Sequence, residues 1–152
     1  MAENLKLSWD IIEKDCQLLA LKIGPCDVIV ALGRGGLAPG VILSHILKTP
    51  LFNFGITSYR EKKSEEPKVS QIPGLKFNSD FRNKRVIIFD DLSDKGSTLT
   101  FVKEYFDLNE FINYKFATLY IKTSTKFIPN FYVKNFDDNI WLDFPWEASN
   151  IE

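Results

Sequence analysis

Acidic and hydroxyl-bearing side chains gather around one glycine in residues 90–98, which read Asp-Asp-Leu-Ser-Asp-Lys-Gly-Ser-Thr. The part from Lys95 to Thr98 precedes a predicted helix, and such a loop presents backbone N–H groups and the positive end of the helix dipole to an anion. Asp90 and Asp91 would repel a phosphate, but their carboxylates suit sugar hydroxyls or a hard divalent cation. The stretch therefore predicts a site for a phosphorylated sugar bound with Mg²⁺.

A second glycine-rich segment, Gly33-Arg34-Gly35-Gly36, directly follows the apolar run 28–32. Two other conspicuous side chains are Lys122, which ends a later apolar run, and Trp141 in the C-terminal part. Ligands of parallel sheets bind beyond the carboxyl ends of the strands, where loops and helix N-termini meet. We therefore expect one site to collect these residues and the acidic stretch.

The elements that must position these residues alternate between strands and helices. Helices are predicted from Ser8, as a cap, to about 23, from about 37 to 48, and from 99 to about 106. Strands are predicted at 28–32, 51–58, 85–89 and 116–121, with an edge strand near 72–75 and shorter extended pieces at 131–134 and 140–142. This order predicts an α/β fold with a mainly parallel twisted sheet flanked by helices.

Residues 60–68 contain no apolar side chain, which is typical of a mobile surface excursion. No repeat, low-complexity tract or linker divides the chain, and 152 residues suit one compact domain, 1–152. His45 lies on the apolar side of the second predicted helix, so we expect a packed ring there and no catalytic role. Trp146 is likewise interpreted as a packing residue.

The composition limits the possible partners. The chain has 19 Lys and Arg against 20 Asp and Glu, and the net charge of −1 offers no general attraction to nucleic acid or to an anionic membrane. No apolar run approaches the roughly 20 residues that span a bilayer, and the N-terminal residues lack the order of a signal peptide. We therefore expect a cytoplasmic protein without stable membrane insertion, in which Cys16 and Cys26 are reduced and partly buried.

Two familiar nucleotide loops are absent: the Lys-Ser/Thr pair of the P-loop and the G-x-G-x-x-G spacing of dinucleotide folds. Residues 87–98 instead resemble the signature of type I phosphoribosyltransferases, in which an apolar strand is followed by two acids, a third acid and a phosphate loop. The usual loop is Thr-Gly-Gly-Thr, so Lys95 and Ser97 depart from the commonest form.

The resemblance extends along almost the whole chain to bacterial xanthine-guanine phosphoribosyltransferases. Residues 32–40 resemble the segment that holds pyrophosphate, and 57–59 resemble the entry to the mobile catalytic loop. Lys122 and residues 140–147 resemble the part that holds the purine. The resemblance implies the type I phosphoribosyltransferase fold with a mobile loop at about 60–70 and a small base-binding C-terminal hood at about 123–152.

The same resemblance implies an Mg²⁺-dependent transfer from 5-phosphoribosyl 1-pyrophosphate (PRPP) to a 6-oxopurine: guanine, xanthine or hypoxanthine. Binding of PRPP falls to Gly33, Arg34, Gly35, Asp90, Asp91, Asp94, Lys95, Gly96, Ser97 and Thr98. Among these, Asp91 is the implied metal ligand and Asp94 the implied catalytic residue near N7 of the base. The base is assigned to Lys122, Trp141 and the backbone carbonyl of Leu142. The family also implies a homodimer or homotetramer.

Two alternatives remain open. Lys95 and Ser97, together with Glu65 where the enterobacterial-type enzyme has an arginine, favour a regulator that binds PRPP or nucleotide without catalysis. The balanced charge argues against the nucleic-acid surface that such regulators need. Transfer to orotate or adenine is a further alternative, against which Lys122 and Trp141 argue.

Overall fold

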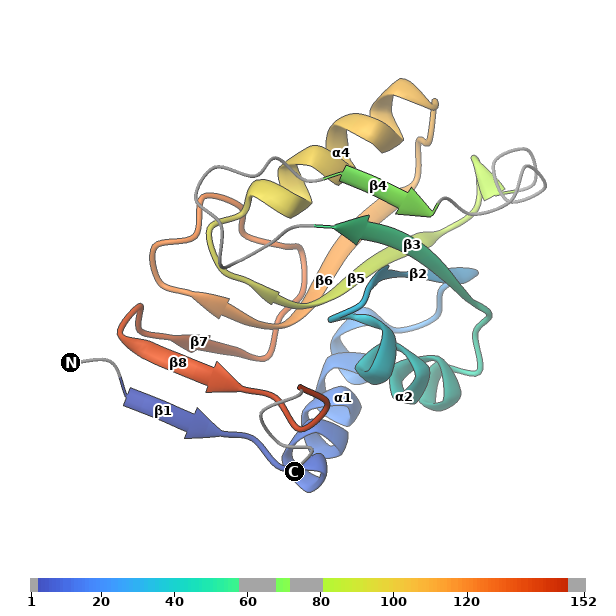
Figure 1. Cartoon of the computed structure of the whole chain (residues 1–152). Helices are drawn as coiled ribbons and strands as arrows, with labels where there is room; N and C mark the ends of the chain where they lie inside the picture. The colour runs from blue at the N-terminus through green and yellow to red at the C-terminus, as the bar shows by residue number, and fades with distance from the viewer. Residues whose placement is uncertain (1–2, 58–67, 72–80, 148–152) are drawn as a thin grey trace.

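The structure is a computed structural model that describes residues 3–57, 68–71 and 81–147 (Figure 1). Its helices are α1 (Trp9–Ile23), α2 (Leu37–Leu47) and α4 (Ser97–Leu108). Its strands are β1 (Glu3–Lys6), β2 (Val28–Gly33), β3 (Leu51–Thr57), β4 (Lys68–Gln71), β5 (Val86–Ser93), β6 (Tyr114–Lys122), β7 (Lys134–Phe136) and β8 (Ile140–Asp143). The predicted edge strand at 72–75 lies outside the described residues, as does most of the mobile loop predicted at about 60–70; residues 68–70 of that loop belong to β4.

Six strands of the described chain form one sheet in the order β4-β3-β2-β5-β6-β7. Every neighbouring pair is parallel except β3 and β4, which pair antiparallel at one edge. α4 covers one face, and α1 and α2 cover the other (Figure 1). The α/β fold with a mainly parallel sheet, predicted from the order of apolar runs, is confirmed.

The sequence patterns explain the central elements. β2 is a run of apolar residues that packs on both faces: Ile29 contacts the core under α1 and α2, and Val28 and Val30 contact the core under α4. α1 begins where the Ser8 hydroxyl accepts the Ile11 N–H at 3.2 Å. It ends at Gly24, whose positive φ of 70° favours glycine.

A second, two-stranded sheet lies beside the main one, where β1 pairs in parallel with β8 (Figure 1). The sequence predicted a base-binding hood at about 123–152 and did not predict a strand at Glu3–Lys6. We call the pair of strands β1 and β8 the hood. All four β1 residues are exposed, so the strand carries no alternation of buried and exposed positions that would have revealed it.

Other boundaries also differ from the predictions. β5 continues past Phe89 as far as Ser93, so the paired acids lie within the strand and not in a loop. The extended piece expected at 131–134 is displaced to β7, although Phe131 forms an isolated bridge with Ala117. Lys68 belongs to β4 and not to the polar excursion.

His45 is exposed, so the prediction that its ring is packed is wrong. The helix α2 has apolar residues on several sides, and Val41 and Ile46 are also exposed. Cys16 and Cys26 are both free thiols, buried and half-buried respectively, as expected. No helix among the described residues is long and apolar enough to cross a membrane.

Candidate active site

The glycine-rich segment after β2 lies against the end of β5, as the topology predicted. A Cβ atom placed on Gly35 would lie 2.7 Å from Oδ2 of Asp91, and one on Gly36 would lie 2.8 Å from the Phe89 carbonyl oxygen. Only glycine permits this close approach. The exposed side chain of Arg34 and the Asp91 carboxyl therefore belong to one region at the carboxyl end of the sheet.

The three acids of the motif occupy different environments. Asp91 is buried, with 5% of its surface exposed, whereas Asp90 is half-buried and Asp94 is exposed. The Asp90 carboxylate also accepts the Asp91 backbone N–H at 2.8 Å, which fixes its orientation. Asp94 follows the end of β5 and is the acid most accessible to a ligand.

The phosphate loop is supported from behind by the turn that follows β6. A Cβ atom on Gly96, whose φ is 93°, would lie 2.7 Å from the Phe127 backbone nitrogen. The Ser93 hydroxyl donates to the Phe127 carbonyl oxygen at 2.8 Å, and the Lys126 N–H donates to the Lys95 carbonyl oxygen at 3.2 Å. Both the positive φ and the close packing require glycine at position 96.

The helix α4 starts at Ser97, directly after this loop, and no side chain caps its N-terminus. The first N–H groups of a helix have no acceptor within the helix, so they point outward as donors for an anion. Ser97 and Lys95 are exposed, and Thr98 is half-buried. The start of α4 therefore presents backbone donors suited to an anion, and the phosphate site expected here from the sequence stays a prediction.

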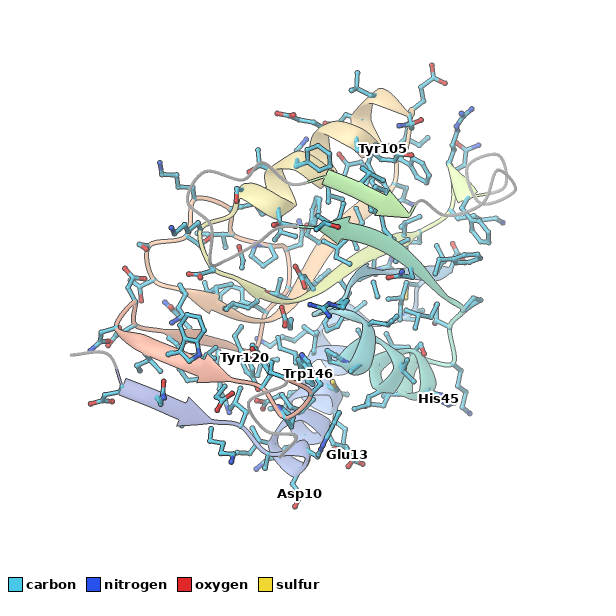
Figure 2. All side chains as sticks on the ribbon, viewed as in Figure 1. Asp10, Glu13, His45, Tyr105, Tyr120 and Trp146 are labelled. Carbon is cyan, nitrogen blue, oxygen red and sulfur yellow. The ribbon has the colours of Figure 1, made fainter. Side chains whose placement is uncertain are left out.

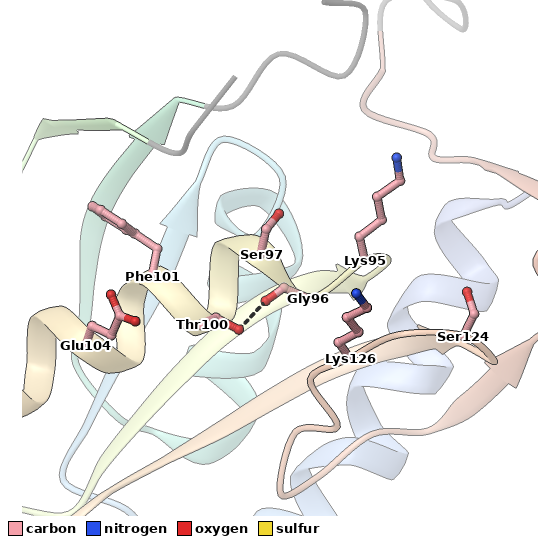
Figure 3. Close-up of a pocket in the computed structure, with 8 residues that line it drawn as sticks. All are labelled: Lys95, Gly96, Ser97, Thr100, Phe101, Glu104, Ser124 and Lys126. Carbon is pink, nitrogen blue, oxygen red and sulfur yellow. Dashed lines mark hydrogen bonds between the residues drawn. The ribbon is translucent and has the colours of Figure 1, made fainter. Parts of the chain in front are cut away.

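A cleft of about 660 Å³ opens beside the loop (Figure 3). It is lined by Lys95, Gly96, Ser97, Thr100, Phe101, Glu104, Ser124 and Lys126. The two lysines place positive charge near the start of α4, and Glu104 lies one turn further along the helix from Thr100. Ser124 and Lys126 were not predicted from the sequence, because they reach the loop from the turn after β6 and belong to no local motif.

Lys122 is buried at the end of β6, with 5% of its surface exposed. Its ammonium donates to the backbone carbonyl oxygen of Ile140, at the start of β8, and lies 3.5 Å from that of Asp137. Trp141 on β8 is 48% exposed, and its neighbour Leu142 is buried. The structure thus brings Lys122 next to the strand that carries the other two residues assigned to the base.

The aromatic residues at the chain ends have a packing role. The Trp146 ring stacks on Phe144 with centroids 4.8 Å apart and contacts Trp9 of α1 at 5.9 Å. This agrees with the interpretation of Trp146 as a packing residue. Trp141 remains the exposed tryptophan of the hood strand, next to the buried Leu142.

A mainly parallel sheet with acids and a phosphate loop at its carboxyl end defines an α/β protein of the type I phosphoribosyltransferase fold, as predicted. Residues 7–151 match the family model of the phosphoribosyl transferase domain. The chain therefore belongs to the phosphoribosyltransferase family and is an enzyme of that class.

Relatives of known name cover nearly the whole chain. It is 29% identical to the xanthine-guanine phosphoribosyltransferase of Cereibacter sphaeroides over 155 residues, covering 97% of this chain and 89% of the relative. It is 33% identical to the enzyme of the same name from Gluconobacter oxydans, covering 94% and 84%. The resemblance to xanthine-guanine phosphoribosyltransferases is thus confirmed.

Solved structures with the same fold include a purine phosphoribosyltransferase. A purine phosphoribosyltransferase from Pyrococcus horikoshii matches with a TM-score of 0.80 and 36% identity over 95% of both chains. A hypothetical protein from Neisseria gonorrhoeae, solved with bound ppGpp, matches with a TM-score of 0.83 and 26% identity over 99% of this chain and 93% of its own.

Proposed function

We propose that this enzyme transfers the phosphoribosyl group of PRPP to a 6-oxopurine, giving the nucleoside 5′-monophosphate and pyrophosphate. The observation that carries the proposal is the Lys122 ammonium, buried beside the hood strand at the end of the sheet where the phosphate loop lies. The names of the relatives, which specify xanthine, guanine or purine, support the same substrate class.

Lys122 accounts for the preference among bases. An ammonium only donates hydrogen bonds, so it pairs with the 6-oxo oxygen of guanine, xanthine or hypoxanthine. The 6-amino group of adenine would face it donor to donor, and the unpaired groups would cost about 1–3 kcal/mol. In this proposal Trp141 stacks on the purine and the Leu142 carbonyl oxygen contacts the substituent at C2.

The phosphate loop and the Arg34 segment divide the charges of PRPP between them. Backbone N–H groups of Lys95 to Thr98, including Gly96, and the hydroxyls of Ser97 and Thr98 hold the 5′-phosphate. Gly33, Arg34 and Gly35 hold the pyrophosphate, and Asp90 and Asp91 hold the ribose hydroxyls. Cleavage at C1′ separates a positively charged sugar from a highly charged leaving group, so fixed charges placed at both ends lower the barrier.

Asp94 is proposed as the catalytic residue. It is exposed at the start of the phosphate loop, between the acids of β5 and the helix α4. A carboxylate there lies beside the sugar site and can accept or hold the proton at N7 of the base while the new bond to C1′ forms.

The residues present fit a magnesium ion that is shared with substrate. The described residues contain no group of three or more acids, histidines or cysteines that would form a complete protein cage. Mg²⁺ is commonly held by one or two carboxylates and completed by substrate phosphates and water. Asp91, buried against the Gly35 backbone, is the proposed ligand. When bound, Mg²⁺ would offset the negative charge of the pyrophosphate.

We also propose a homodimer or homotetramer in the cytoplasm, without nucleic-acid partners or stable membrane insertion. Exposed Leu37, Val41 and Ile46 on α2 give this helix an apolar surface suited to contact with a second copy. The net charge of −1 gives no electrostatic basis for binding nucleic acid. Sedimentation analysis tests the assembly, and a monomer at all concentrations would contradict it.

The function is tested by supplying PRPP and Mg²⁺ with guanine, xanthine, hypoxanthine, adenine or orotate in separate reactions and following nucleotide formation by absorbance. We expect turnover with at least one 6-oxopurine and none with adenine or orotate. Absence of turnover with every 6-oxopurine would overturn the proposal. Tight nucleotide binding without turnover would support the regulator instead.

A further inference from the structure

A buried carboxylate links the base-binding part of the molecule to its first helix. Asp15 of α1 is 1% exposed, and its Oδ2 accepts the Tyr120 hydroxyl at 2.5 Å and faces Lys134 Nζ at 3.2 Å. Tyr120 and Lys134 are register partners on β6 and β7. A buried carboxylate is costly unless it is paired, so its two partners fix the relative positions of three elements. We call these residues the Asp15 cluster.

Aromatic packing connects the Asp15 cluster to the end of the hood. The Tyr120 ring packs edge-on against Phe136 at 5.2 Å and stacks with Phe144, just after β8, at 6.2 Å. Phe144 in turn stacks on Trp146, which contacts Trp9 at the start of α1. Tyr120 and Trp146 both lie near β8 and α1 in Figure 2. The Tyr120 ring is therefore in contact with a row of aromatic rings that runs from Phe136 through Phe144 and Trp146 to Trp9.

The Asp15 cluster also lies close in the fold to the residues assigned to the base. Tyr120 precedes Lys122 by two residues on β6, and side chains two apart point to the same face of a strand. Asp15 belongs to the helix that directly follows β1, and β1 pairs with β8, which carries Trp141 and Leu142. The cluster thus joins the strand of Lys122 to the helix that directly follows β1, one of the two paired strands of the hood.

We propose that the Asp15 cluster sets the distance between Lys122 and β8, and so acts as a set of positioning residues for the purine base. The proposal rests on the 6-oxopurine function proposed above. Burial, together with the hydrogen bond to Asp15, raises the pKa of Tyr120. The phenol therefore remains protonated, and a donor to Asp15, throughout the physiological pH range.

The chain contains a matched control. Tyr114, Asp107 and Lys103 form a second cluster of the same chemistry, in which the Tyr114 hydroxyl and Lys103 both bond to Asp107. The side chains of Lys103 and Asp107 are each 52% exposed. Tyr114 starts β6 and Lys122 ends it, so the two are about 26 Å apart along the strand. Losing this exposed hydroxyl should not affect the base site.

The test compares Tyr120→Phe with Tyr114→Phe, because each removes one hydroxyl and keeps the ring. We expect Tyr120→Phe to raise the KM for guanine about 3- to 10-fold and to leave the KM for PRPP unchanged. Tyr114→Phe should change neither constant. Amide hydrogen exchange in β1 and β8 should accelerate in Tyr120→Phe only, which reports hood position without requiring turnover.

Lys134→Met is the second variant, chosen in case Tyr120→Phe fails to fold. It removes only the half-exposed cation of the Asp15 cluster and should produce a smaller rise in the KM for guanine and the same acceleration of exchange in the hood.

Three results decide whether the Asp15 cluster positions the base site. The proposal is overturned if Tyr120→Phe matches Tyr114→Phe in base KM and hood exchange, or if the KM values for guanine and PRPP rise together, which would indicate general loosening. If the wild-type enzyme turns over no 6-oxopurine, the proposed function fails, and hood exchange alone decides whether the Asp15 cluster positions β8.

Discussion

In the proposed function, the side chain of Lys122 serves both structure and base recognition. Two of its contacts are with backbone carbonyl oxygens of Asp137 and Ile140, which precede or begin the hood strand. An ammonium has three N–H donors, so these two contacts leave a third direction for the oxygen of a base. The residue that we assign to base recognition therefore also helps to hold the strand that carries Trp141.

Replacing Lys122 with methionine removes the charge and keeps much of the chain length. Because a hydrogen bond from a charged group contributes about 1.5–3 kcal/mol, we expect the affinity for guanine to fall about 10- to 100-fold. PRPP contacts other loops, so its affinity should remain. Calorimetry with each ligand separately measures both, and an equal loss of the two affinities would contradict the assignment.

Asp94→Asn removes a proton acceptor and keeps the shape of the side chain. Since general acid or base catalysis typically contributes 10²- to 10⁴-fold, we expect the chemical step to slow by about 100-fold or more while PRPP affinity changes little. Single-turnover kinetics separate the chemical step from binding. A variant that binds PRPP poorly but reacts at the normal rate once saturated would show that Asp94 serves binding alone.

At the level of elements, long apolar runs were predictable and short polar ones were not. Helices cover both faces of β2, β5 and β6, so these strands contain mostly apolar runs, 28–32, 86–89 and 116–121, that are visible in the sequence. β1 is exposed along its whole length and is defined by its pairing with β8, a contact between distant parts of the chain. No local pattern encodes such a strand.

The candidate site also contains residues that a local sequence pattern reveals and residues that only the tertiary fold brings in. Motif residues 90–98 were recognisable because the phosphate loop is a local structure, built from consecutive backbone groups. Lys126 and Ser124 reach that loop from another element, and their contribution depends on tertiary packing. The prediction for His45 failed because the apolar residues of α2 do not form a single face, and helical spacing alone does not show which side is covered.

The phosphate loop gives a prediction at this scale. In Gly96→Ala the new methyl group would contact the Phe127 backbone, and the positive φ adds strain of about 1–3 kcal/mol. We expect a loss of stability and a fall in PRPP affinity, measured by chemical unfolding and calorimetry. Gly24→Ala is the control, because Gly24 has φ 70° but nothing within 4 Å of its added Cβ. It should lose stability only. Normal PRPP affinity in Gly96→Ala would contradict the role of the loop.

On the scale of the whole molecule, the net charge of −1 does not reveal that basic and acidic residues gather at one end of the sheet. Arg34, Lys95 and Lys122 belong to segments that converge on one end of the sheet, and the acids of β5 lie among them. Two other ionisable groups, Cys16 and Tyr120, are buried in the neutral form in the core between the sheet and the helices α1 and α2. The residues proposed to bind substrate thus lie at one end of the sheet, and the core beneath α1 and α2 holds these two groups in their neutral form.

Because the Cys16 thiol is buried, the free energy of unfolding should fall at alkaline pH. Burial, with smaller contributions from Asp15 and Glu13, raises the pKa of the Cys16 thiol from 9.0 to about 12. The unfolded chain releases this proton first, so the contribution of Cys16 is complete below pH 9 and is lost as pH rises from 9 towards 12. Urea unfolding between pH 8 and 11 should show a falling midpoint, and Cys16→Ala should show a shallower fall. Parallel curves for the two proteins would contradict this.

The pairing of β1 with β8 also sets the order in which the two halves of the site can be completed during synthesis. The loop at Lys95–Thr98 is supported by the turn that ends at Phe127, whereas Trp141 lies on the last strand of the described chain, β8, which pairs with β1. A growing chain can therefore form the proposed sugar-phosphate side of its site before the proposed base side. β1 and β8 can pair only when the chain as far as Asp143 has left the ribosome, so a contact between distant parts of the described chain completes the proposed base site last.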